Sequence, residues 1–351
     1  MTGYLKLTTY FGERLRYEGG FTSDALLDLY ARNSVATSVV LRGIAGFGPR
    51  HELRSDQSLS GSEDLPVAIA AVDTETKMAG LVEQVVALTR RGLVTLERAH
   101  LVGAEAPEVP STAKLTIYVD RHERISGEPA FRALCNLLRT RGLSCAAAFL
   151  GVDGTSRGER RRARFFSRNV NVPVMVIAIG SKTQVSEALQ EIGRMVHEPL
   201  LTVERVQLCK RDGELLTRPP ALPAFDDHGV PLWQKLMIYT AEDTLHDGEP
   251  IHRAIVRRLR EPPEDLGATV LRGAWGFHGN HEPHGDKLFQ LGRQVPVTTI
   301  IVDSPDRIAT SFDVVDELTT RHGVVTSELV PALVSIDGDR RGGTTLARFD
   351  L

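Results

Sequence analysis

The chain has 351 residues, of which 42% are hydrophobic and 25% are charged, and its formal net charge is −3. This composition is ordinary for a folded globular protein. A protein that binds nucleic acid over a large surface would need a basic net charge, which this chain lacks. The sequence contains no apolar run of the roughly 18 residues that a membrane span needs, and its N-terminus lacks the apolar core of a signal peptide. We therefore expect a cytoplasmic protein without nucleic acid as a partner.

The first hundred residues alternate between two periodicities. In chain order, they predict a strand at Tyr4–Phe11, a helix around Leu26 and Tyr30, a strand at Val35–Ile44, a polar loop at Pro49–Asp64, a strand at Val67–Val72, a helix at Thr74–Arg90 and a strand at Val94–Leu101. The order βαββαβ is that of the ferredoxin-like arrangement, in which both helices cover one face of the sheet.

This pattern occurs three times. Lys6-Leu7-Thr8-Thr9-Tyr10 returns as Lys114 to Tyr118 and as Lys235 to Tyr239, and the Thr-x-Glu at Glu97 returns at Glu204 and Glu328. The offset is 107 or 108 residues from copy one to copy two, and 121 to 124 from copy two to copy three. A period this long indicates complete small domains rather than solenoid units. We therefore predict an α+β chain of three tandem ferredoxin-like domains.

The predicted boundaries follow the repeats. Domain one spans residues 1–102, a divergent domain two spans 113–210, a Pro-rich linker spans 211–233, domain three spans 234–334, and a flexible tail spans 335–351. The third strands of copies one and two are apolar at every position, as in strands that are buried on both faces. Because the helices cover one face only, we expect the other two copies to cover the second face. The chain would then be a monomer that acts as an intramolecular trimer, a pseudotrimer.

Two runs resemble the signature of domain-of-unknown-function family 190. They are Leu41-Arg42-Gly43-Ile44-Ala45-Gly46-Phe47-Gly48 with the following Leu65-Pro66-Val67, and Leu271-Arg272-Gly273-Ala274-Trp275-Gly276-Phe277 with Val295-Pro296-Val297. Copy two departs from the signature, with Leu150 in place of the arginine and Thr155 in place of the aromatic residue. The family resembles the PII signalling proteins, which implies trimers with small molecules between subunits. It also implies that the loops Pro49–Asp64, Ser156–Asn171 and His278–Arg293 contact a protein partner, by PII analogy a transporter or channel.

The signature residues also suggest a ligand site by their chemistry. Glycine admits a close backbone approach, and an arginine fork binds phosphate or carboxylate with two parallel hydrogen bonds. These properties predict a small anionic ligand, such as a nucleotide, at Arg42, Gly43, Gly46, Phe47, Arg272, Gly273, Gly276 and Phe277. The alternative is a structural arginine paired with a nearby acid, such as Glu97 or Glu328, and glycines that only shape the end of a strand.

Copy two carries a basic loop. Arg157, Arg160, Arg161, Arg162, Arg164 and Arg168 stand against Glu159 alone. Such a cluster suits an anion or an acidic partner, with Arg160, Arg161, Arg162 and Arg164 as the candidates, whereas the alternative is a solvated loop.

Copy three carries a histidine loop. His278, His281 and His284 follow one another at intervals of three residues. The imidazole side chain suits a divalent transition metal, so these three are the candidate ligands. Polar loop histidines are the alternative reading.

The sequence matches no catalytic motif, since it contains no nucleophile elbow, HExxH or dinucleotide fingerprint. Cys135, Cys145 and Cys209 show no CxxC spacing and are expected to be buried free thiols. We therefore predict a non-enzymatic PII-like sensor, with a metal-binding or ion-homeostasis module as the alternative.

Overall fold

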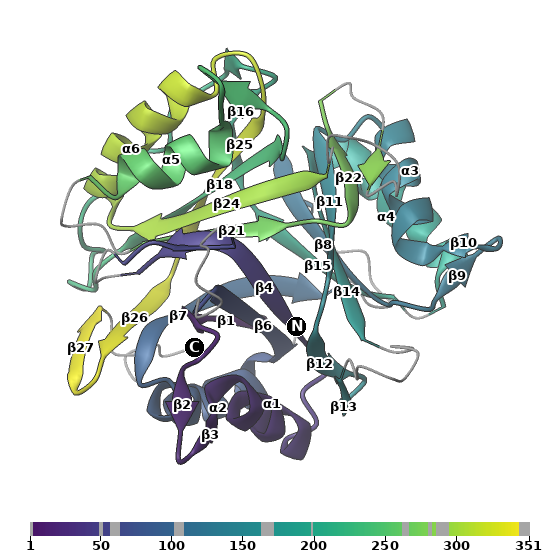
Figure 1. The fold of residues 1–351 in the computed structure, drawn as a ribbon. Helices are drawn as coiled ribbons and strands as arrows, with labels where there is room; N and C mark the ends of the chain where they lie inside the picture. The colour runs from purple at the N-terminus through teal and green to yellow at the C-terminus, as the bar shows by residue number, and fades with distance from the viewer. Residues whose placement is uncertain are drawn as a thin grey trace.

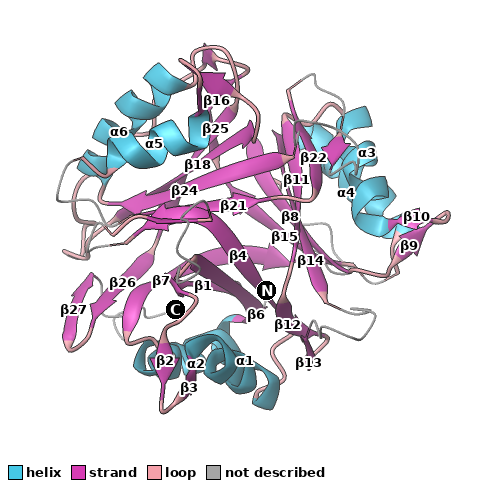
Figure 2. Ribbon diagram, in the orientation of Figure 1, coloured by secondary structure: helices cyan, strands magenta, loops and turns pink. Residues whose placement is uncertain are grey.

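The computed structural model describes residues 3–48, 52–56, 64–101, 109–162, 172–197, 199–261, 267–279, 283–285 and 295–343. Three copies of one βαββαβ unit are arranged around a common centre, each with its two helices on the outside (Figure 1). Figure 2 shows the same division into outer helices and inner strands. The predicted fold class is thereby confirmed.

The main elements of the three copies correspond, except that the single strand β4 of copy one is divided into two strands in copies two and three. Copy one consists of β1 (Tyr4–Gly12), α1 (Thr22–Arg32), β4 (Thr37–Phe47), β6 (Pro66–Thr74), α2 (Glu75–Leu88) and β7 (Arg91–Leu101). Copy two consists of β8 (Thr112–Asp120), α3 (Ala130–Thr140), β11 (Cys145–Leu150), β12 (Asp153–Ser156), β14 (Pro173–Ser181), α4 (Lys182–Met195) and β15 (Leu200–Arg205). Copy three consists of β18 (Trp233–Ala241), α5 (Ile251–Leu259), β21 (Ala268–Arg272), β22 (Trp275–His278), β24 (Pro296–Asp303), α6 (Pro305–Leu318) and β25 (Val324–Val330).

Each of these units also contains short additional strands. A two-stranded hairpin precedes the first helix of each copy, formed by β2 (Arg16–Tyr17) with β3 (Gly20–Phe21), β9 (Arg124–Ile125) with β10 (Glu128–Pro129), and β19 (Leu245–His246) with β20 (Glu249–Pro250). The remaining strands are β5 (Arg54–Ser55), β13 (Glu159–Arg162), β16 (Gln207–Arg211), β17 (Glu214–Leu215), β23 (His284–Gly285), β26 (Ala332–Asp337) and β27 (Arg340–Gly343).

Within each copy the sheet is antiparallel, in the order second, third, first and last strand: β4-β6-β1-β7, β11-β14-β8-β15 and β21-β24-β18-β25. Side chains alternate between two cores, because successive residues of a strand point to opposite faces. In β6, Val67, Ile69 and Ala71 pack under the helices of copy one. Ala68 and Val72 pack instead into a central core that all three copies share. The prediction that the copies cover one another's open sheet faces is confirmed.

The last strand of each copy continues toward the next copy. The end of β7 pairs with β15, β16 pairs with β25, and β26 pairs with β7. The predicted flexible tail is wrong for residues 335–343, because β26 and β27 form a hairpin against copy one. Similarly, residues 211–215 of the predicted linker belong to the β16–β17 hairpin. Backbone hydrogen bonds to a neighbouring copy hold both segments, which composition alone does not reveal. In the described part of the chain, the helices are too short or too polar to cross a membrane.

Candidate functional site: the clefts between copies and the central charge ring

The signature glycines lie where one copy's backbone crosses onto the next. The end of β4 pairs with β21 of copy three, β22 pairs with β11 of copy two, and β12 pairs with the start of β4. A Cβ atom on Gly46 would lie 2.4 Å from the carbonyl oxygen of Ala268, and one on Gly276 would lie 2.2 Å from that of Ala146. The glycines therefore permit strand pairing between copies, which explains them without a ligand.

The aromatic residues of the signature are core residues. Phe47 is buried among the residues of copy three, and Phe277 is buried among those of copy two. Thr155 holds the matching place in copy two and hydrogen-bonds Ser38 of copy one at 2.9 Å between the hydroxyl oxygens. Each copy therefore anchors the next with one side chain beyond its second glycine.

The signature arginines pair with acids other than those expected. Arg42 binds Glu13 at 2.8 Å, and Arg272 binds Glu242 at 2.5 Å and Asp56 of copy one at 3.1 Å. Glu13 and Glu242 occupy matching positions after the first strand of their copies. Copy two, which has Leu150 in place of the arginine, has Arg121 in place of the acid. This exchange within one chain was the sequence signal for the pair, and the suggested partners Glu97 and Glu328 were wrong.

Three arginines of the basic loop of copy two pair with acids of copy one or of copy two itself. Arg160, on β13, bonds Asp24 at 2.6 Å, Asp28 at 2.5 Å and Asp153 at 2.8 Å. Arg162 lies 3.3 Å from Asp24, and Arg161 bonds Glu159 at 2.5 Å. The candidate Arg164 lies outside the described residues. Arg160 therefore fastens the β12–β13 hairpin to helix α1.

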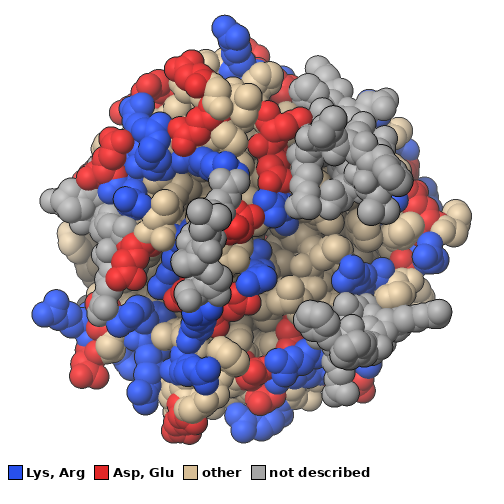
Figure 3. Space-filling model, in the orientation of Figure 1, with Lys and Arg blue, Asp and Glu red and all other residues tan. Residues whose placement is uncertain are grey.

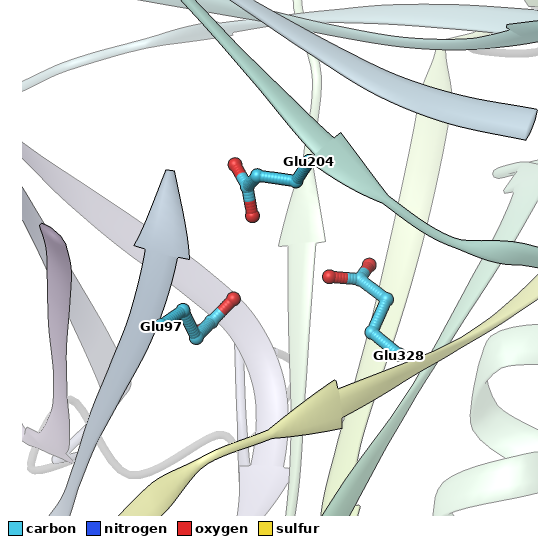
Figure 4. A group of neighbouring side chains, drawn as sticks. All are labelled: Glu97, Glu204 and Glu328. Carbon is cyan, nitrogen blue, oxygen red and sulfur yellow. The ribbon is translucent and has the colours of Figure 1, made fainter. Parts of the chain in front are cut away.

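The histidine cluster is not assembled within the described part of the chain. His278 is buried on β22, opposite Cys145 of β11. His281 and the side chain of His284 lie outside the described residues. The group with metal-ligand spacing among the described residues is a different one, Glu97, Glu204 and Glu328, whose carboxylate oxygens lie within 4.8 Å of one another (Figure 4).

These three glutamates form a closed ring with three lysines at the centre of the molecule. Lys6 lies 3.1 Å from Glu97 and 2.6 Å from Glu204. Lys114 binds Glu204 at 2.8 Å and also Glu328. Lys235 closes the ring, 2.5 Å from Glu97 and 3.2 Å from Glu328. Each lysine therefore joins the glutamate opposite it in its own sheet to a glutamate of another copy.

The ring is buried and neutral, with three charges of each sign. Burial alone would raise the pKa of Glu97, but Lys235 and Lys6 hold it well below its usual range. Burial alone would lower the pKa of Lys6, but Glu204 and Glu97 raise it well above its usual range. The three ammonium groups already supply the cations that the carboxylates need. The glutamates therefore do not fit a metal site, and they fit the junction between copies.

A cavity of about 110 Å³ opens between copies one and three. Tyr10, Phe47 and Pro66 contribute apolar surface, and Ile336 contributes more from the C-terminal hairpin. Two arginines line the same space, each with a carboxylate partner. Arg54 binds Asp64 at 3.0 Å, and Arg91 binds Asp337 of the hairpin at 3.1 Å.

A second cavity, of about 240 Å³, lies in the matching cleft between copies two and one. Its lining has changed relative to the first. Tyr118 and Pro173 replace Tyr10 and Pro66, while Glu123 and His197 bring different polar groups. The clefts are therefore equivalent in position and different in chemistry. Of the residues predicted to bind a ligand, Gly46 and Phe47 line the first cavity, and none is among the described residues that line the second. The prediction missed Arg54 and Arg91.

The family of uncharacterized ACR proteins, domain-of-unknown-function family 190, matches the chain three times, at residues 4–101, 112–208 and 233–332. The chain belongs to this family. Its repeats are therefore three members of family 190 in tandem, in the positions that the landmarks predicted. A relative in Aquifex aeolicus, a UPF0166 protein, is 32% identical over 99 residues, which are 28% of this chain and 90% of that protein.

Two further similarities are more limited. A catalase-peroxidase of Parvibaculum lavamentivorans is 33% identical over 129 residues, 34% of this chain but only 18% of that protein. A solved aspartate kinase from Synechocystis aligns with 95% of this chain and 45% of its own, at 10% identity and a TM-score of 0.26. This TM-score is too low to indicate a shared fold with the family 190 chain.

Proposed function

We propose that this chain is a non-enzymatic PII-like regulatory protein of family 190, a cytoplasmic monomer that binds a small ligand between its copies. The observation that carries the proposal is the cavity between copies one and three, where apolar surface and two arginines converge. Cavities at domain interfaces with a few convergent polar groups are the usual form of ligand sites. Three buried free cysteines suit a reducing compartment.

The lining indicates the class of ligand. Tyr10, Phe47 and Ile336 offer a surface for an apolar or planar body. Arg54 and Arg91 offer guanidinium groups to an anionic end, since such forks bind phosphate and carboxylate. Asp64 and Asp337 occupy those guanidinium groups in the free protein, so an anionic ligand would displace them. A nucleotide combines both features.

Displacement also offers a route to a partner. Arg54 and Asp64 lie within the segment between β4 and β6, which corresponds to the partner-contacting loop of PII proteins. A ligand that binds better to one arrangement of this segment would shift its population, and a protein partner would read that change. Because Asp337 belongs to the C-terminal hairpin, a ligand that displaces it from Arg91 would also change how the hairpin is held against copy one.

Two substitutions of opposite effect test the site. Nucleotides are first screened by thermal shift, because a ligand that binds the folded state stabilises it by mass action. For a ligand found this way, we expect Arg91→Ala to weaken binding and Asp337→Asn to strengthen it, since the second change removes a competing carboxylate. Arg340→Ala, on the same hairpin outside the cavity, is the control. Equal affinity in all three variants would refute the proposal.

A further inference from the structure

A separate pocket of about 660 Å³ lies above the central charge ring. Glu97, Glu204 and Glu328, one from each copy, line its inner end and are almost fully buried. The last strands of the three copies, β7, β15 and β25, provide further lining. The pocket therefore lies where the three copies meet, whereas the proposed ligand cleft lies between two of them.

The linker between copies two and three closes one side of this pocket. Thr217, Pro220 and Leu222 belong to its lining. The side chain of Gln207 donates hydrogen bonds to the Thr217 hydroxyl at 3.2 Å and to the carbonyl oxygen of Arg218 at 2.9 Å. Gln234 donates to the carbonyl oxygen of Pro220 at 3.3 Å. This wall requires a fused chain, because separate subunits would carry no such connection.

The charge of the pocket is positive. The three glutamates are balanced by Lys6, Lys114 and Lys235 within the ring, so they add no net charge. Arg98 and Arg205 follow Glu97 and Glu204 at matching positions and line the pocket. Among the described residues, the side chains of Arg98 and Arg205 have no ion-pair or hydrogen-bond partner, in contrast to those of Arg54 and Arg91 in the cleft. A concave site with unbalanced charge of one sign concentrates ligands of the opposite sign.

We propose that this axial pocket binds a small phosphate-bearing molecule, held by the guanidinium groups of Arg98 and Arg205. Guanidinium forks bind phosphate with paired, charge-assisted hydrogen bonds. His100 and the hydroxyl groups of Ser111 and Thr112 line the same space and add donors. Copy three has Leu329 at the third matching position, so the anion lies toward copies one and two.

Inorganic pyrophosphate is the probe, titrated into the full chain by calorimetry. We expect saturable binding to the wild type and a loss of affinity of about tenfold for each of Arg98→Ala and Arg205→Ala, as expected for a lost charge-assisted contact. Both side chains are exposed, so the variants should fold normally. Arg98→Lys keeps the charge without the fork and should give an intermediate affinity.

Two control variants separate this site from other sources of binding. Arg32→Ala with Arg194→Ala removes two exposed arginines of helices α1 and α4, and should leave the affinity unchanged. Arg54→Ala with Arg91→Ala disables the cleft and should also leave it unchanged. Unchanged affinity in the Arg98 and Arg205 variants, loss of binding in the cleft variant, or absence of saturable binding to the wild type would each overturn the proposal.

Discussion

Replacement of Lys114 by methionine is expected to destabilise the fold by about 3–5 kcal/mol, the usual cost of removing one partner from a buried ion pair. Lys114 is 1% exposed and binds the carboxylates of Glu204 and Glu328, which are also buried. Methionine matches the length of the lysine stem but supplies no charge. The ring would then hold two cations and three anions away from water.

A second substitution tests whether neutrality is the cause. Glu204→Gln added to Lys114→Met leaves Lys6, Lys235, Glu97 and Glu328, two charges of each sign. The double variant should therefore be more stable than Lys114→Met alone, although it carries one more substitution. In a double-mutant cycle, the two changes should differ from additivity by more than about 1 kcal/mol, as groups in one network do.

Urea unfolding at neutral pH measures these differences, with the free energy of unfolding obtained from the midpoint and slope. Lys77→Met is the matched control. Lys77 pairs with Asp73 at 2.9 Å, and its own side chain is 37% exposed. The Asp73 carboxylate also accepts hydrogen bonds from the backbone N–H groups of Ala36 and Thr74, so the loss of Lys77 should cost clearly less than the loss of Lys114. Additive effects of Lys114→Met and Glu204→Gln, or equal costs for Lys114→Met and Lys77→Met, would contradict the reasoning.

Further predictions concern other parts of the molecule. Gly46→Ala should destabilise the fold because its Cβ atom would lie 2.4 Å from a carbonyl oxygen, whereas Gly80→Ala in α2, where nothing lies within 4 Å, should stabilise it by up to about 1 kcal/mol; thermal unfolding distinguishes the two. Folding lowers the pKa values of Glu97 and Glu204, so their ionised carboxylates stabilise the folded state above their unfolded pKa of about 4.5. This contribution to the free energy of unfolding is lost progressively as the pH falls below that value. The stability difference between the wild type and Glu97→Gln, measured by urea unfolding at several pH values, should accordingly narrow on acidification and widen again toward neutrality. Burial raises the pKa of Cys209 to about 12, and the thiols of Cys135 and Cys145 are buried as well, so Ellman's reagent should react with the three thiols only after unfolding; rapid reaction of the native protein would contradict this. Calorimetric titration of a cleft ligand should give at most two strong sites per chain, since the cleft between copies two and one has Glu123 and His197 in its lining and lacks the pair Arg54 and Arg91. Three equal sites would refute this.

The sequence was sufficient to predict the fold because the fold depends on patterns that repeat locally. The apolar run Val67–Val72 also predicted correctly that both faces of the strand are buried. The charge ring was not predicted, although the repeat landmarks contained both Lys6 and Glu97. Lys6 binds Glu204, which is 198 residues away, and this contact depends on how the copies are arranged around their centre.

The candidate site was harder to predict for a related reason. Arginine and glycine at the end of a strand have the same appearance whether they bind an anion or another copy of the domain. Only the neighbouring strand, β21 for Gly46 and β11 for Gly276, distinguishes the two roles. The tail was misjudged because β26 has its pairing partner, β7, more than two hundred residues earlier in the chain.

Comparison of the three copies within this chain separates its structural features from its variable ones. The lysine, the glutamate and the second glycine occur in every copy, and each forms a contact between copies. The arginine with its acid, the residue beyond the second glycine and the cleft linings differ between copies. Figure 3 shows that positive and negative side chains are interspersed on the face drawn, so the described surface of this face does not carry one continuous patch of a single charge. Because a fused chain builds each interface from different residues, one cleft can change without altering the others. The interfaces that hold the copies together cannot diverge as freely, since each ring residue contacts two others. The ring and the glycines therefore account for the assembly, and the divergent clefts are where different ligand preferences would arise.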